Sequence, residues 1–146
     1  MSADGTPRIL EDIEAFIHDF EACRLPKDRW THHGHLLAGL WYLWHYPPDE
    51  ALALVRRRIR AHNESVGTAN TDSGGYHETL TALFLHGIAW HRAAHPEATL
   101  AESLTLLLQS PLSSSQWPLT FYSKELLFSV AARRAWMEPD LTPLAL

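Results

Sequence analysis

The stretch TPRILEDIEAFIHDFEACRLP, residues 6–26, decides the fold class of this chain. Its apolar side chains recur three or four residues apart, which is the spacing of one face of an α-helix. They are Leu10, Ile13, Phe16, Ile17 and Phe20. Pro26 closes the pattern because proline has no amide hydrogen for a helical bond. The stretch therefore predicts an amphipathic helix with one face against a core.

The rest of the chain repeats this organisation, with proline, glycine and capping residues between helical segments. Further helices are expected at residues 31–46, 48–66, 76–95, from 99 onward, and in short closing segments between 123 and 136. Residues 67–75 and 110–121 are expected to be loops. Because no segment alternates apolar and polar residues as a strand would, residues 1–146 are predicted to form one all-α domain, a compact bundle of five to six helices.

Four side chains predict where helices begin. Thr31 and Thr99 stand where an N-cap hydroxyl would accept a backbone hydrogen bond, and Glu102 completes a capping box with Thr99. Ser123 and Ser129 have the same role ahead of the closing helices. These residues set the expected order of helix and loop.

Composition limits the functional classes. The chain has 146 residues, a formal net charge of −5 and one cysteine, which excludes an internal disulfide and a thiolate-only zinc site. No apolar run reaches the roughly 20 residues that span a bilayer, so a soluble, cytoplasmic protein with no membrane partner is expected. The run RRRIR, residues 56–60, is a basic helix face. Given the negative overall charge, a solvated face is the better interpretation, and no nucleic-acid partner is expected.

Histidine spacing suggests a metal site. His32 and His35 are three residues apart on one helix face and can direct two imidazoles at one ion. His77 lies where the expected loop at residues 67–75 runs into the next helix, and it is the candidate third ligand. A helix N-terminus disfavours the protonated ring and so keeps a lone pair available for a metal. Imidazole suits zinc, nickel or iron, and spacing does not separate these metals. The alternative is that the same histidines pack and form hydrogen bonds.

Two further residues are candidates for chemistry beside that metal. Glu78 follows His77 and would act as a general base, although its position three residues after Gly75 also fits a carboxylate that satisfies helix N-terminal amides. Tyr122 would orient a substrate by hydrogen bonding.

Three stretches carry a family resemblance. They are WTHHGHL (residues 30–36), IRAHNESVGTANTDSGGYHETLT (59–81) and FYSKELLFSVAARRAWMEPDL (121–141), and they cover a minority of the chain. In the motifs WTHxxHL, NTxxGGYHETLT and FYSxxLLFSxxAR the chain resembles a family of uncharacterised, all-helical bacterial proteins with no settled activity. The resemblance implies one neighbourhood for the motif residues and adds four candidate substrate-binding residues, Asn63, Asn70, Tyr76 and Ser123.

Two functions remain open from the sequence. The first is a metal-dependent enzyme with one divalent ion on three histidines and an open position for water or a small-molecule substrate. The second is a non-catalytic helical module that binds a small molecule or a protein. Neither interpretation fixes the oligomeric state.

Overall fold

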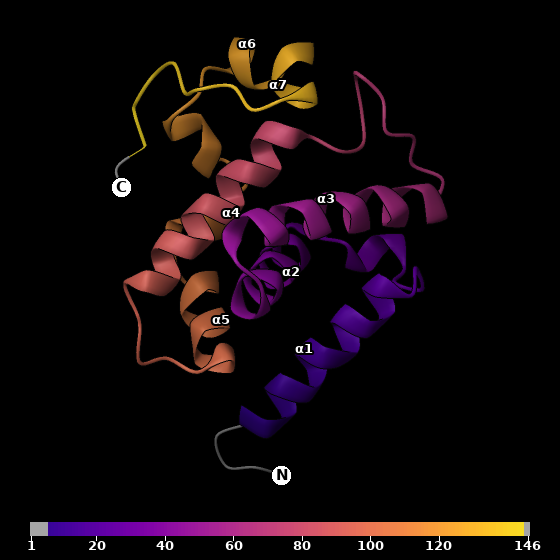
Figure 1. Ribbon diagram of the computed structural model, residues 1–146, viewed down its shortest axis with the longest axis vertical. Helices are drawn as coiled ribbons and strands as arrows, with labels where there is room; N and C mark the ends of the chain where they lie inside the picture. Colours follow the sequence, from indigo (N-terminus) through magenta and orange to yellow (C-terminus); the bar gives the residue numbers. More distant parts are fainter. Residues whose placement is uncertain (1–5, 145–146) are drawn as a thin grey trace.

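The computed structural model describes residues 6–144 and the side chains from Leu10 onward, and within this part of the chain the fold is all-α, as predicted. Five longer helices and two short ones follow one another around a shared core (Figure 1). They are α1 (Thr6–Glu21), α2 (His32–His45), α3 (Pro48–Ser65), α4 (Glu78–Ala93), α5 (Leu100–Leu108), α6 (Lys124–Leu127) and α7 (Val130–Arg134). The predicted domain also includes residues 1–5 and 145–146, which lie outside the described part of the chain.

The helix ends follow the predicted capping chemistry. Thr31 Oγ1 accepts from the amide of Gly34 at 3.2 Å, and Thr99 and Glu102 form a reciprocal capping box. Ser123 and Ser129 cap α6 and α7 through their hydroxyls. These four caps confirm the predicted starts of α2, α5, α6 and α7.

Helix α2 lies at the centre of the bundle and packs against α1, α3, α4 and α5 (Figure 1). The approach of α4 depends on Gly39, because a Cβ there would lie 2.7 Å from Cδ1 of Ile88. The main core contains the apolar face predicted for α1, with Ile13, Phe16, Ile17 and Phe20 all buried, whereas Leu10 is exposed. Burial of this apolar face on a central helix is what holds the five longer helices together.

A second, smaller core attaches the C-terminal segment to α4. Leu83, Tyr122 and Leu127 form it, with α6 and α7 placed over one end of α4 (Figure 1). Thr79 Oγ1 donates to the carbonyl oxygen of Ala135 at 2.9 Å and accepts from the amide of Met137 at 3.2 Å. The C-terminal segment is thereby fixed near the start of α4, next to the candidate residues Tyr76, His77 and Glu78.

Two boundaries differ from the sequence predictions. Helix α4 begins at Glu78 and not at residue 76, because His77 has an extended backbone and serves as the N-cap. The segment 110–121, predicted as a loop, contains two short 3-10 turns, Pro111–Ser113 and Trp117–Thr120. A third such turn, Lys27–Arg29, connects α1 to α2. Across residues 6–144, no helix combines the length and apolarity needed to cross a bilayer.

Candidate binding pocket

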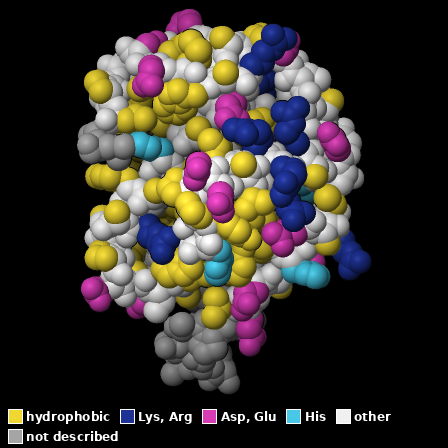
Figure 2. Space-filling view, in the orientation of Figure 1, with side chains coloured by type: hydrophobic (Ala, Val, Ile, Leu, Met, Phe, Trp, Pro, Cys, Tyr) yellow, Lys and Arg dark blue, Asp and Glu magenta, His cyan; other side chains and the backbone are white. Residues whose placement is uncertain are grey.

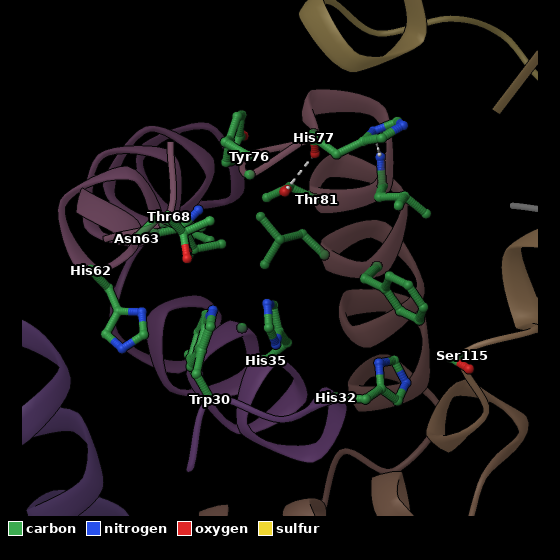
Figure 3. Close-up of a pocket in the computed structure, with 18 of the residues that line it drawn as sticks. Trp30, His32, His35, His62, Asn63, Thr68, Tyr76, His77, Thr81 and Ser115 are labelled. Atoms are coloured by element: carbon green, nitrogen blue, oxygen red, sulfur yellow. Dashed lines mark hydrogen bonds between the residues drawn. The ribbon is translucent and has the colours of Figure 1, made fainter. Parts of the chain in front are cut away.

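A pocket of about 580 Å³ opens between α2, α3 and α4. Its walls are largely aliphatic and aromatic, with Val55, Ile59, Leu85 and Ile88 among them. The polar residues around it include four histidines, together with Asn63, Thr68, Tyr76, Thr81 and Ser115 (Figure 3). A mostly apolar hollow with a small number of polar groups is the usual form of a small-molecule site.

His35 presents an acceptor nitrogen to this pocket. Its Nδ1 donates to the carbonyl oxygen of Thr31 at 2.7 Å, which leaves the lone pair on Nε2 without a partner among the described residues. Solvent reaches the ring through the pocket, yet protein atoms surround it closely enough that desolvation lowers its pKa to about 4. The nearby His32 and His62 lower the pKa further, and the Thr31 bond opposes them. At neutral pH the ring is therefore uncharged and accepts a hydrogen bond at Nε2.

Trp30 forms an aromatic wall beside His35. The two ring centroids are 3.9 Å apart, and on its other side the indole stacks on Phe20 at 4.5 Å. In Figure 3, Trp30 and His35 lie side by side with their rings directed toward the middle of the pocket. A flat apolar ligand would find an aromatic surface next to a hydrogen-bond acceptor.

His62 is a buried neighbour of Trp30 beside the pocket. Its side chain is completely buried, and Nε2 donates to the carbonyl oxygen of Leu25 at 3.1 Å. The other ring nitrogen, Nδ1, is buried and has no hydrogen-bond partner. His62 is among the residues around the pocket, and its ring lies 5.3 Å from the ring of Trp30, on the side away from the middle of the pocket (Figure 3). Because the side chain is completely buried, a ligand in the pocket does not reach Nδ1.

The ring of His77 is bonded to the backbone through both nitrogens and is not directed toward His35. Its Nδ1 accepts from the amide of Leu80 at 3.1 Å, and its Nε2 donates to the carbonyl oxygen of Leu127 at 2.7 Å. Burial lowers its pKa, so the ring is neutral as the sequence predicted, but both nitrogens are occupied by the backbone. In Figure 3 the ring points away from the middle of the pocket.

His32, the remaining candidate ligand, is bonded to the backbone through one of its two ring nitrogens. Its Nε2 lies 2.8 Å from the carbonyl oxygen of Leu112, and its ring meets Phe84 edge-on. Among residues 6–144, no group of three or more His, Cys, Asp or Glu side chains is placed to hold a metal ion. Of the three predicted ligands, His35 and His32 each keep one ring nitrogen without a hydrogen-bond partner among the described residues, whereas both nitrogens of His77 have one.

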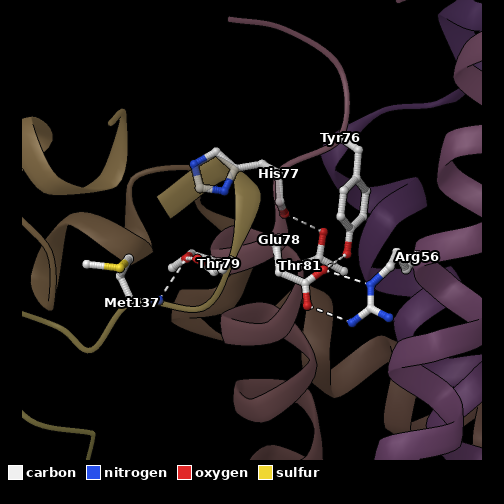
Figure 4. Close-up of polar contacts among 8 residues, drawn as sticks. Arg56, Tyr76, His77, Glu78, Thr79, Thr81 and Met137 are labelled. Atoms are coloured by element: carbon white, nitrogen blue, oxygen red, sulfur yellow. Dashed lines mark hydrogen bonds and ion pairs between the residues drawn. The ribbon is translucent and has the colours of Figure 1, made fainter. Parts of the chain in front are cut away.

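Glu78, the predicted general base, faces a different partner. Its carboxylate accepts from Nε and Nη2 of Arg56 at 2.8 and 2.7 Å and from the hydroxyl of Tyr76 at 2.7 Å (Figure 4). Burial opposes its ionisation, but these hydrogen bonds outweigh burial and hold its pKa below the usual value. The alternative role at helix N-terminal amides is not what the structure shows, because the cap is His77. Glu78 joins α4 to α3 as an ionised acceptor.

Tyr122 and Ser123 hold the C-terminal segment and do not line the pocket. The buried Tyr122 hydroxyl donates to the carbonyl oxygen of Met137 at 2.6 Å, and burial, with the nearby Glu138 and Asp140, raises its pKa to about 12. Ser123 Oγ donates to Asp140 at 2.6 Å while it caps α6. Both side chains form structural contacts, and neither lies at the pocket.

The asparagines and Tyr76 are brought together, as the shared motif implied. Asn70 Oδ1 accepts from Asn63 Nδ2 at 2.9 Å and from the amide of Tyr76 at 3.0 Å. This folds the loop against α3, and Gly75 at φ +78° completes the turn, since a Cβ there would lie 2.5 Å from a backbone oxygen. Asn63 and Tyr76 line the pocket, whereas Asn70 faces a second hollow.

Sequence analysis missed Trp30 and His62 as pocket residues. A signal for His62 was present, because Val55, Ile59 and His62 are four and three residues apart and fall on one face of α3. An inward-facing histidine in an otherwise apolar row is a candidate for a polar group in a cavity. Trp30 stands beside a motif histidine, but no local pattern indicates which way its ring turns.

Comparisons with protein families, with curated proteins and with solved structures found no match to this chain. The family resemblance of the three motif stretches therefore stays a prediction, and the candidate site rests on its own geometry.

Proposed function

We propose that this protein binds a small, uncharged and largely apolar molecule in the pocket between α2, α3 and α4. The observation that carries the proposal is the acceptor nitrogen Nε2 of His35, which lies beside Trp30 in an apolar hollow. The ring is oriented by the hydrogen bond from its Nδ1 to the carbonyl oxygen of Thr31. The ligand class follows: a flat molecule that lies against Trp30 and donates an N–H or O–H to an imidazole.

The charge of the lining supports an uncharged ligand. Lys27 is the one Lys, Arg, Asp or Glu side chain among the described lining residues, and it is exposed. A carboxylate or phosphate in the pocket would face the neutral imidazole of His35, whose Nε2 offers a lone pair and no proton. Desolvation of an unpaired charge in such a place is costly. A neutral donor matches both the apolar walls and the His35 acceptor.

A matched pair of probes tests the proposal. Indole and 1-methylindole have similar shape, but indole alone donates an N–H. We expect indole to bind about 2–10-fold more tightly, which is the affinity that one hydrogen bond of about 0.5–1.5 kcal/mol supplies. Ligand-observed NMR and calorimetry would measure both affinities.

Variants on one turn of α2 supply the control. His35→Ala should abolish the preference for indole, whereas His33→Ala, at an exposed position that does not line the pocket, should leave it unchanged. Absence of saturable binding by either probe, or equal affinities in the native protein, would contradict the proposal.

A second candidate is the metal-dependent function predicted from the sequence. One observation favours it: His35 is neutral, with Nδ1–H on a carbonyl and Nε2 free, which is the arrangement of metal-binding histidines. A single imidazole holds zinc, nickel or iron weakly, so the remaining ligand atoms would have to come from a bound small molecule. Titration with each metal, alone and with a chelating probe such as 8-hydroxyquinoline, tests this candidate. Metal uptake that needs the probe and is lost in His35→Ala supports it, and uptake unchanged by that substitution contradicts it.

A further inference from the structure

A second hollow, of about 390 Å³, lies on the other side of the Tyr76 turn from the pocket. Four arginines line it, two from α3 and two from the end of α7, together with two carboxylates. They are Arg56, Arg60, Arg133, Arg134, Asp72 and Glu78, which we call the arginine cleft. Figure 2 shows Lys and Arg side chains gathered over α3 and α7 on this face of the molecule.

The two carboxylates are each engaged by one arginine. Glu78 accepts two hydrogen bonds from Arg56, and Asp72 accepts two from Arg134 at 2.7 and 2.6 Å. These bidentate pairs lower the pKa of Asp72 and leave neither carboxylate for the other two arginines. Two positive charges in the cleft are therefore uncompensated.

The uncompensated charges belong to Arg60 and Arg133. Arg133 Nη1 donates to the main-chain oxygens of Gly75 and Tyr76 at 3.1 and 3.3 Å, which orients the guanidinium without neutralising it. The guanidinium of Arg60 lies over the ring of Tyr76, 5.7 Å from the centroid. Within residues 10–144, neither side chain forms an ion pair.

We infer that the arginine cleft binds the phosphate group of a small molecule. A phosphate dianion would match the two uncompensated charges, whereas a carboxylate would match one. Guanidinium groups donate in a planar fork that suits phosphate oxygens, and the contacts to backbone and carboxylates already hold three of the four in place. A chain with a net charge of −5 that concentrates positive charge in one hollow favours a small anion over an extended polyanion.

Phenyl phosphate is the probe, with benzoate as the carboxylate counterpart and sodium chloride at equal ionic strength as the screening control. We expect saturable calorimetric binding of phenyl phosphate, with a Kd lower than that of benzoate. Arg60→Gln should weaken it about tenfold, since one charge-assisted contact is removed. Arg57→Gln is the matched control, because Arg57 is exposed on the same helix and does not line the cleft.

The Arg60 side chain makes no main-chain hydrogen bond in the native protein, so Arg60→Gln should fold. This variant keeps the test valid even where Arg133→Gln loses stability. Equal binding of the two probes, an equal loss in Arg57→Gln, or tighter binding of a short DNA duplex that displaces phenyl phosphate would overturn the inference. Because the indole preference depends on His35, it should persist in Arg60→Gln, so this inference and the proposed function can fail independently.

Discussion

Replacement of His77 by alanine distinguishes a structural histidine from a metal ligand. The alanine removes two backbone contacts at once. Loss of the N-cap acceptor for Leu80 costs about 1 kcal/mol, and the buried carbonyl of Leu127, left without its donor, costs about 1–3 kcal/mol. We therefore expect His77→Ala to lower the free energy of unfolding by about 2–4 kcal/mol.

Urea denaturation followed by circular dichroism would measure this loss, with unchanged m-values as the check that only stability differs. His77→Asn is the graded variant, because asparagine is a good N-cap but is too short to replace the Nε2 contact with Leu127. It should recover about 1 kcal/mol of the loss. His33→Ala, at an exposed position, should stay within about 0.5 kcal/mol of the native protein.

The result that refutes this reasoning is specific. If His77→Ala unfolded within about 0.5 kcal/mol of the native protein, the two backbone contacts would not be contributing to stability. If the same variant also lost a stoichiometric metal, the imidazole would be a ligand and the cap incidental. Ligand binding in the pocket should survive the substitution, because the ring points away from it.

Three further outcomes follow from the structure. The pKa of His35 is about 6.5 in the unfolded chain and about 4 in the folded protein. The stability that the neutral ring contributes is therefore complete above pH 6.5 and is lost as the pH falls toward 4. His35→Gln should flatten that decline in urea denaturation. Gly75→Ala should destabilise more than Gly67→Ala in thermal melts: both have positive φ, which costs alanine about 1–2 kcal/mol, but only at Gly75 does the new Cβ meet backbone. Tyr122→Phe should lose about 1–3 kcal/mol of unfolding free energy, by leaving a carbonyl unpaired, with indole binding unchanged.

The fold was predictable because its signals are local. The apolar spacing of residues 6–26 identified the buried face of α1, and Pro47 and Pro48 separated α2 from α3. Cap residues act within three positions of themselves, so Thr31 and Ser123 could be recognised from sequence alone. Helix α4 was placed two residues early because a histidine cap is unusual beside Ser, Thr, Asp and Asn.

The site was harder to predict because the state of each imidazole depends on distant backbone. The Nδ1 bond of His35 reaches a carbonyl four residues away, and a helical turn makes that contact readable from sequence. His32 and His77 instead bond to carbonyls 80 and 50 residues away, which no spacing indicates. Spacing therefore put three imidazoles on one candidate metal, and only tertiary packing shows which of them keeps a free lone pair.

The prediction for His77 also illustrates why a correct electrostatic argument can lead to a different role. A neutral imidazole at a helix start was expected from the helix dipole, and its pKa is lowered, although burial is the first cause. A metal ligand and an N-cap place the same demand on the ring, because each uses the lone pair of a neutral nitrogen. Neutrality alone therefore does not choose between them. The group that faces the lone pair does: for His77 it is the amide N–H of Leu80, which donates to it, whereas the Nε2 lone pair of His35 faces the open pocket.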